Sequence, residues 1–342
     1  MELQVIWFIL WGLLWAVYFM LDGFVIGMGM ISGALAKTDT EKRVLIQTVG
    51  PVWDGNEVWL VTAGGATFAA FPGTYALMFS YLYTALLLLL FALIVRGVSF
   101  EFRGKIDDAR WRTFWDGAIV VTGFLLALLF GVAFGNIFKG LPMNAGGYQG
   151  SFFTLLNPYG LLTGVLFLLL FALHGALYLS VKTEGDLCRR AEALAGKLWI
   201  PVLLAVAAFL VYSKIGTNLL ANYFAMPVLM VLPLAAAASL LSIRFFMARK
   251  AWHRAFAFSC ATVLLVTFTG VAGLFPNLIP SSLDPAWSLT IYNSSSSPYT
   301  LRIMAVVAFI FVPVVVAYKI WVYRIFRARV TVEDVLKDSH HY

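Results

Sequence analysis

The hydrophobic positions of this chain fall into long runs that short polar connections separate. A helix needs about 20 apolar residues to cross a bilayer, and nine runs approach or exceed that length. The run at 198–213 is the shortest of them. The pattern predicts an all-α integral membrane protein of about nine transmembrane helices. The expected spans are 6–36, 44–71, 74–96, 114–138, 158–181, 198–213, 224–243, 255–279 and 300–323.

Lysine and arginine are concentrated in alternate connections. The connections after spans one, three, five and seven, together with the segment that closes the chain, hold 21 of the 24 basic residues. The remaining connections hold only Lys139, Lys214 and Arg302. Because cytoplasmic loops carry an excess of Lys and Arg, we expect the N-terminus outside and the C-terminus in the cytoplasm. That orientation requires an odd number of spans.

Two segments of the chain resemble each other weakly. Gly131–Pro142 follows the pattern of Gly270–Pro280, and Asp22-Gly23 has a counterpart in His174-Gly175. A repeat would give two four-helix bundles, at 1–140 and 155–282, plus one peripheral helix at 300–323, within a single polytopic membrane domain covering 1–342. Chance similarity between helices rich in Gly, Ala and Phe is the alternative.

The composition agrees with a membrane protein. Hydrophobic residues make up 61% of the 342 positions and charged residues 12%, with a mean hydropathy of +0.88; soluble proteins carry about a quarter charged residues. The net charge of +7 follows the topology and so does not indicate nucleic acid binding. Cys188 and Cys260 lie far apart, which predicts neither a disulfide nor a zinc site.

Acidic residues lie inside two of the expected spans. Asp22 is near the middle of the first, and the second carries Asp54, Asn56 and Glu57. Charges at bilayer depth are costly and usually mark ion or proton paths. On a helix, Asp54 and Glu57 share one face, and one of two such carboxyls is expected to hold a proton. The alternative is that these acids only bond neighbouring helices or pair with Arg96.

Arg96 ends the third expected span, and Glu101 and Arg103 follow it. The simplest interpretation of Arg96 is a side chain that snorkels to the cytoplasmic interface. Alternatively, Arg96 or Arg103 pairs with Glu101 or Asp54 at the mouth of a polar path.

The histidines limit the redox chemistry of this chain. Of the four, only His174 lies at membrane depth, whereas His253 is in a connection and His340 and His341 are at the tail. A haem held by two histidines inside this chain is therefore excluded, although a His–Met pair stays formally possible. We expect His174 to bond a neighbouring helix, and we expect any redox metal to reside mainly in a partner.

Several motifs together resemble subunit II of the cytochrome bd-type quinol oxidases. They are Asp22-Gly23-Phe24, Trp53-Asp54-Gly55-Asn56-Glu57-Val58-Trp59, Phe68–Ala76, Arg96–Arg103, Gly131–Pro142, Asn157–Gly160 and Phe275–Ser282. The resemblance extends over essentially the whole chain and is densest in the first 160 residues. The Trp53–Trp59 block is specific to this family.

The resemblance implies a haem-free subunit that pairs with a related, haem-bearing subunit I in a pseudo-symmetric heterodimer. Haems b558, b595 and d would reside in subunit I, and the complex would oxidise quinol and reduce dioxygen to water. No cofactor would bind this chain. A small single-helix accessory subunit and membrane lipid are further partners, in the plasma membrane of a bacterium or archaeon.

By matching positions, the resemblance makes Asp54 the acid of a cytoplasmic proton path, flanked by Asn56 and Glu57. Many family members carry a second acid in the first motif, where this chain has Val25, so more weight falls on Asp54 and Glu57 than on Asp22. Two other interpretations stay open. The chain could be an independent proton-coupled transporter with a site near the midplane, or a structural partner whose acids only fix helix packing.

Overall fold

The computed structural model describes residues 2–337, so His340 and His341 lie outside the described residues. The described chain is mainly helical. Its α-helices are α1 (Leu3–Leu35), α2 (Asp39–Val49), α3 (Trp53–Ala70), α4 (Pro72–Tyr81), α5 (Tyr83–Phe102), α6 (Ala109–Lys139), α7 (Pro158–Lys182), α8 (Gly185–Gly216), α9 (Ala221–Ala225), α10 (Val231–Ala248), α11 (Trp252–Leu274), α12 (Pro298–Ile325) and α13 (Val332–Lys337). Short 3-10 helices cover Phe153–Leu156, Pro227–Met230 and Pro285–Trp287.

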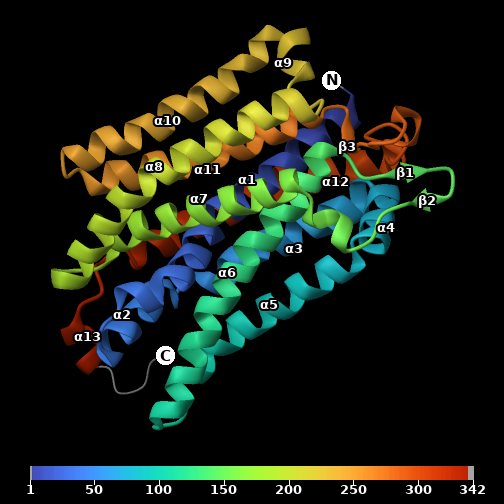
Figure 1. Ribbon diagram of the computed structural model, residues 1–342. Coiled ribbons are helices and arrows are strands. Elements are labelled where there is room, and N and C mark those ends of the chain that lie inside the picture. Colours follow the sequence, from blue (N-terminus) through green and yellow to red (C-terminus); the bar gives the residue numbers. More distant parts are fainter. Residues whose placement is uncertain (1, 338–342) are drawn as a thin grey trace.

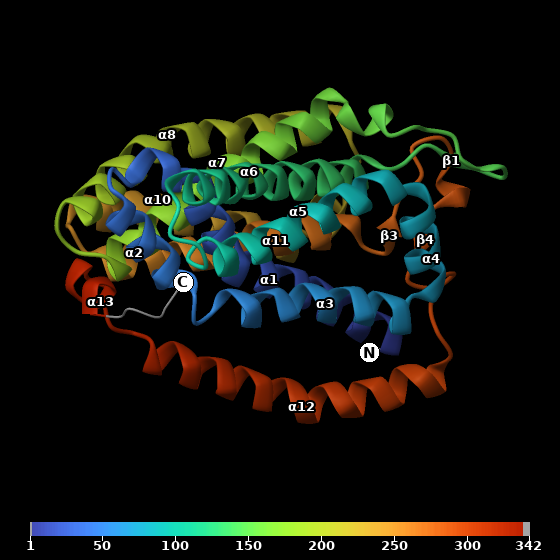
Figure 2. The same cartoon turned by 90° about the horizontal axis from the view of Figure 1, so that it is seen from below.

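The long helices lie side by side in one bundle (Figure 1). Two small antiparallel hairpins close one end: β1 (Met143–Asn144) pairs with β2 (Gly147–Tyr148), and β3 (Asn277–Ile279) pairs with β4 (Leu289–Thr290). Helices α2 and α13 lie at the opposite end, and α12 runs along one edge of the bundle beside α3 (Figure 2).

The two segments that resemble each other in sequence meet at the hairpin end. The amide of Leu141 donates to the carbonyl oxygen of Pro280 at 2.9 Å, and the amide of Ser282 donates back to Leu141 at 2.8 Å. These hydrogen bonds connect the segments that follow α6 and α11. The division of the chain into two related halves stays a prediction.

Among residues 2–337, eight helices are long and apolar enough to cross a membrane. The all-α membrane fold is therefore confirmed. These eight do not include α3, because Asp54, Asn56 and Glu57 make its first turns polar. The count of nine and the orientation remain predictions.

Several expected boundaries were wrong. The span at 44–71 is two helices, because Pro51 has no amide hydrogen and cannot continue α2. The span at 74–96 is likewise two helices, α4 and α5, interrupted at Leu82. The short span at 198–213 is the second half of α8, a helix of 32 residues whose charged beginning resembles a loop in hydropathy. The span at 224–243 is interrupted as well, because α9 and a 3-10 helix precede α10.

Helix α1 forms the centre of the bundle and packs against α3, α6, α7 and α11. It crosses α7 at Gly27 and Gly175. A β-carbon at Gly27 would overlap the carbonyl oxygen of Phe171, so only glycine allows these backbones to approach so closely. By contrast, α12 buries only 6% of its most apolar stretch within the chain. Asp22, the one acid of α1, is therefore held in a tightly packed interior.

Candidate functional site

The polar segment that begins α3 connects three helices. Asn56 is fully buried, and its amide nitrogen donates to the carbonyl oxygen of Leu21 in α1 at 2.8 Å. Its Oδ1 atom accepts the hydroxyl hydrogen of Tyr323 in α12 at 2.9 Å. Asn56 therefore satisfies both ends of its amide and fixes the position of its neighbours Asp54 and Glu57.

Arg96 lies in the interior, where it joins two of the acids singled out by the sequence. Its Nη1 atom donates to Asp22 Oδ2 at 2.9 Å, and its Nη2 atom donates to Glu57 Oε1 at 2.5 Å. The Arg96 side chain is 1% exposed. We refer to Asp22, Asp54, Asn56, Glu57 and Arg96 as the acid cluster.

Two expectations for Arg96 were therefore wrong. It does not snorkel, because it lies more than a turn before the end of α5 at Phe102 and faces α1. It also pairs with neither Glu101 nor Asp54. The interpretation in which the acids pair with Arg96 agrees with the contacts of Asp22 and Glu57, whereas Asp54 is exposed and makes no ion pair within residues 2–337.

The interior of the acid cluster holds polar atoms without a hydrogen-bond partner. Asp22 Oδ1, Arg96 Nε and the Tyr18 hydroxyl are buried and make no hydrogen bond within residues 2–337. Buried polar atoms usually have a partner, because an unpaired one costs free energy. A water molecule or a shared proton would be stabilised here.

Helix α12 adds a cation that the sequence reasoning did not assign to the site. The Nζ atom of Lys319 lies against Gly55, where a β-carbon would overlap it. Asp54 and Asp22 attract this ammonium electrostatically, although Lys319 makes no ion pair with either acid within residues 2–337. In the sequence, Lys319 belongs to the basic residues that close the chain and indicate its orientation. Its place inside an apolar run was the signal that could have marked it.

A second ionic group lies about two turns further along α5. Arg103 is 1% exposed and donates to Asp116 at 2.5 Å and to Asp39 at 2.7 Å, while Lys42 pairs with Asp116 at 2.8 Å. Burial lowers the pKa of Arg103, but the two carboxylates outweigh it and raise that pKa. The expected pairing of Arg103 with Glu101 or Asp54 was wrong, and Glu101 has no ion pair within residues 2–337. The sequence did not indicate Asp39 or Asp116.

His174 bonds two neighbouring helices, as predicted. Its Nδ1 atom lies 2.7 Å from the Ser259 hydroxyl of α11, and its Nε2 atom lies 2.9 Å from the Met20 carbonyl oxygen of α1. Because a carbonyl only accepts, Nε2 carries the proton towards Met20, while the single hydroxyl hydrogen of Ser259 is shared between His174 Nδ1 and the Phe256 carbonyl oxygen. Both ring nitrogens are occupied by protein atoms.

Comparisons with known proteins agree along the whole chain. A family model described as cytochrome bd terminal oxidase subunit II matches residues 3–326. Cytochrome bd-I ubiquinol oxidase subunit 2 of Escherichia coli K12 is 37% identical over 372 aligned positions, which cover 99% of this chain and 98% of that protein. Cytochrome bd ubiquinol oxidase subunit 2 of Bacillus subtilis is 36% identical, covering 96% of this chain and 97% of that protein.

A solved structure has the same fold. A chain of the bd oxidase from Geobacillus thermodenitrificans matches with a TM-score of 0.77, covering 95% of this chain and 99% of that one at 19% sequence identity. At that identity the likeness shows the shared fold alone.

Proposed function

The chain belongs to the cytochrome bd terminal oxidase subunit II family, and we propose that its acid cluster delivers protons from the cytoplasm within such an oxidase. Its relatives are subunits of quinol oxidases, and the chain is a multi-pass membrane protein of the bacterial respiratory chain. The family match extends over residues 3–326 and gives no support to an independent transporter.

The observation that carries the proposal is a graded burial of the acids. Asp54 is exposed, the Glu57 side chain is 25% exposed, and Asp22 is fully buried. Glu57 and Asp22 both contact the guanidinium of Arg96. The acids thus form successive steps from the surface at the start of α3 to the middle of α1. We place that start on the cytoplasmic side, since the basic connections lie at the same end.

A proton path needs groups that can take up and release a proton, and the charge of these groups must be compensated by nearby charges. Arg96 supplies one positive charge for the two carboxyls of Asp22 and Glu57. When both acids are ionised, the three side chains together carry one net negative charge. A proton arriving at Glu57 neutralises that excess. Tyr18 and the unpaired Asp22 Oδ1 atom lie beyond it, where a proton or a water molecule could be held.

We further propose that this chain binds no haem. The proposal is supported by His174, the histidine at membrane depth, which does not fit a haem ligand because both of its ring nitrogens are engaged by Ser259 and Met20. The haems b558, b595 and d would be held by subunit I, the partner in the heterodimer, where dioxygen reduction with quinol electrons consumes protons. In the same proposal this chain stabilises subunit I, and a small single-helix accessory subunit belongs to the complex.

The test uses the assembled oxidase carrying Asp54→Asn. We expect slower quinol-driven oxygen uptake with haem content and subunit stoichiometry unchanged, because the amide cannot exchange a proton. Glu101→Gln is the matched control, since it removes the same charge from an acid without an ion pair within residues 2–337. Wild-type turnover in Asp54→Asn across the pH range would remove Asp54 from the path. Failure to assemble would favour a purely structural role for the acids.

A further inference from the structure

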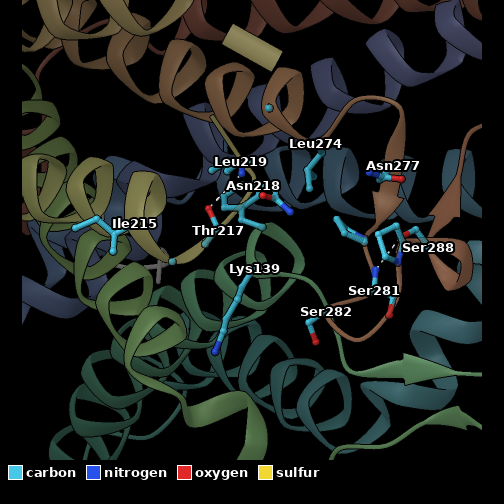
Figure 3. Close-up of a pocket in the computed structure, with 15 residues that line it drawn as sticks. Lys139, Ile215, Thr217, Asn218, Leu219, Leu274, Asn277, Ser281, Ser282 and Ser288 are labelled. Atoms are coloured by element: carbon cyan, nitrogen blue, oxygen red, sulfur yellow. Dashed lines mark hydrogen bonds between the residues drawn. The ribbon is translucent and has the colours of Figure 1, made fainter. Parts of the chain in front are cut away.

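A polar recess of about 540 Å³ lies at the hairpin end of the bundle. It is bounded by the ends of α6, α8 and α11 and by the loop between β3 and β4 (Figure 3). The acid cluster contributes none of its lining residues. The recess is therefore separate from the proposed proton path.

Four polar side chains that line the recess have no protein partner. Lys139, Asn218, Asn277 and Ser282 make no side-chain hydrogen bond or ion pair within residues 2–337. By contrast, the lining residue Thr217 uses its hydroxyl on the Ser213 carbonyl oxygen. Among the described residues that line the recess there is no Asp or Glu, and Lys139 carries their one formal charge. These groups leave donors free for an anionic oxygen.

Negative helix ends converge on the same recess. Helix α6 ends at Lys139, α8 at Gly216 and α11 at Leu274. The C-terminal end of a helix carries about half a negative charge on its free carbonyl oxygens. Within residues 2–337 no hydrogen bond from the following loop reaches the carbonyl oxygens of Ile215 or Gly216. The recess thus offers carbonyl oxygens that can accept hydrogen bonds from a cationic group. It also offers the Lys139 ammonium to an anionic group.

An apolar side adjoins these polar groups. Ile215 lines the recess, and its side chain is 80% exposed at the end of α8, one of the helices able to cross a membrane. Phe138 and Leu274 line it as well. Because α6, α8 and α11 all end here, the recess lies at the depth of the lipid headgroups in either orientation of the chain. The occupant that fits is amphipathic.

We propose that this recess binds the headgroup of a phospholipid with a primary ammonium, such as phosphatidylethanolamine. The phosphate contacts Lys139 and the neighbouring amide and hydroxyl donors. The ammonium donates to the carbonyl oxygens at the end of α8, and the acyl chains follow the exposed side of α8 beside Ile215. A choline headgroup has no N–H to donate, and a glycerol headgroup has no positive charge for the helix ends.

The test is lipid retention by the purified oxidase complex. The complex is exchanged into an equimolar mixture of phosphatidylethanolamine, phosphatidylcholine and phosphatidylglycerol with identical acyl chains, and bound lipid is read by native mass spectrometry. We expect wild type to retain phosphatidylethanolamine preferentially and Lys139→Gln to lose one such lipid mass. Lys214→Gln is the matched control, because Lys214 lies over the Phe224 ring outside the recess, and it should keep the lipid.

Several results would overturn the proposal. An unchanged lipid complement in Lys139→Gln excludes the recess as the site. Equal retention of phosphatidylcholine excludes the ammonium contact, and preference for phosphatidylglycerol identifies a simple anion site. Free phosphoethanolamine serves as a competitor: displacement of the lipid by it supports headgroup recognition. Binding of the free compound without any lipid binding excludes a membrane source.

Discussion

The Tyr323 hydroxyl of α12 donates to Asn56 Oδ1 of α3 across 2.9 Å, although the two residues are 267 positions apart. Asn56 in turn donates to Leu21 of α1. The most peripheral long helix is thereby connected to the central one through a single buried amide.

Arg96 and Asp22 should show strong energetic coupling. Arg96→Gln leaves two carboxyls without their cation and should destabilise the assembled chain by about 3–5 kcal/mol, the usual cost of breaking a buried ion pair. Adding Asp22→Asn should recover part of that loss. Thermal denaturation of the two single variants and the double variant measures the coupling, and strictly additive losses would contradict the pair.

Substitutions of Lys319 and Gly55 should have non-additive effects on oxygen uptake. An alanine at Gly55 displaces the Lys319 ammonium from its place against the beginning of α3, so Gly55→Ala and Lys319→Ala should change oxygen uptake in the same direction. The double variant should be no more impaired than Lys319→Ala alone. Multiplying effects on turnover would show that Lys319 does not act at this place.

The crossing of α1 and α7 should tolerate no side chain at Gly27. Gly27→Ala forces the two helices apart and should cost about 1–3 kcal/mol, the typical penalty for overpacking. Gly64→Ala is the matched control, since nothing lies within 4 Å of a β-carbon there and alanine favours a helix. The measurement is the thermal stability of Gly27→Ala and of Gly64→Ala, each compared with wild type. Equal stability of the two variants would contradict the close approach of α1 and α7.

Glu41 should make the stability of the α2 end depend on pH. Its carboxylate accepts from Arg190 Nη2 and from the Lys37 amide, each at 2.6 Å. Burial raises the Glu41 pKa, but these hydrogen bonds outweigh it and lower that pKa below 4.5. Because the folded pKa lies below the unfolded one, the stabilisation is complete above the unfolded value and is lost as pH falls through the folded one.

Glu41→Gln should therefore cost about 1.5–3 kcal/mol near neutral pH, as expected for hydrogen bonds to a charged group. The difference from wild type should shrink in acid. Melting temperatures of both proteins between pH 7 and pH 3 test this. A difference that stays constant over that range would show that the Glu41 charge contributes nothing.

The sequence predicted the spans better than it predicted their ends. Apolar length identified the helices, because a run that must cross hydrocarbon has few alternatives. Apolar length failed at α8, where Arg189, Arg190 and Lys197 belong to the same helix as the apolar half. Hydropathy falls at these charged residues, but the helical hydrogen bonds of the backbone continue through them. It also missed the interruption at Leu82, for which the local sequence offers no proline or glycine.

Most residues of the candidate site were predicted from the sequence, but their contacts were predicted only in part. Asp22, Asp54 and Glu57 stand out because charge is rare at bilayer depth. Periodicity on one helix says nothing of which neighbour a side chain faces, so the sequence left open whether Arg96 pairs with the acids of the first two spans or with Glu101, and only the fold shows the pairs with Asp22 and Glu57. Tyr323 and Lys319 were missed for the same reason, since only the tertiary fold brings the end of α12 to the beginning of α3.

The position of α12 also has a consequence for how the protein is made. Chains are synthesised from the N-terminus, and earlier segments fold first. Of the helices that form the acid cluster and its contacts, α12 is the last to leave the ribosome, and it carries Lys319 and Tyr323. A nascent chain therefore holds Asn56 without its hydroxyl donor and Gly55 without the Lys319 ammonium against it until translation has passed residue 323. The contacts around Asn56 are complete only after the last long helix has docked.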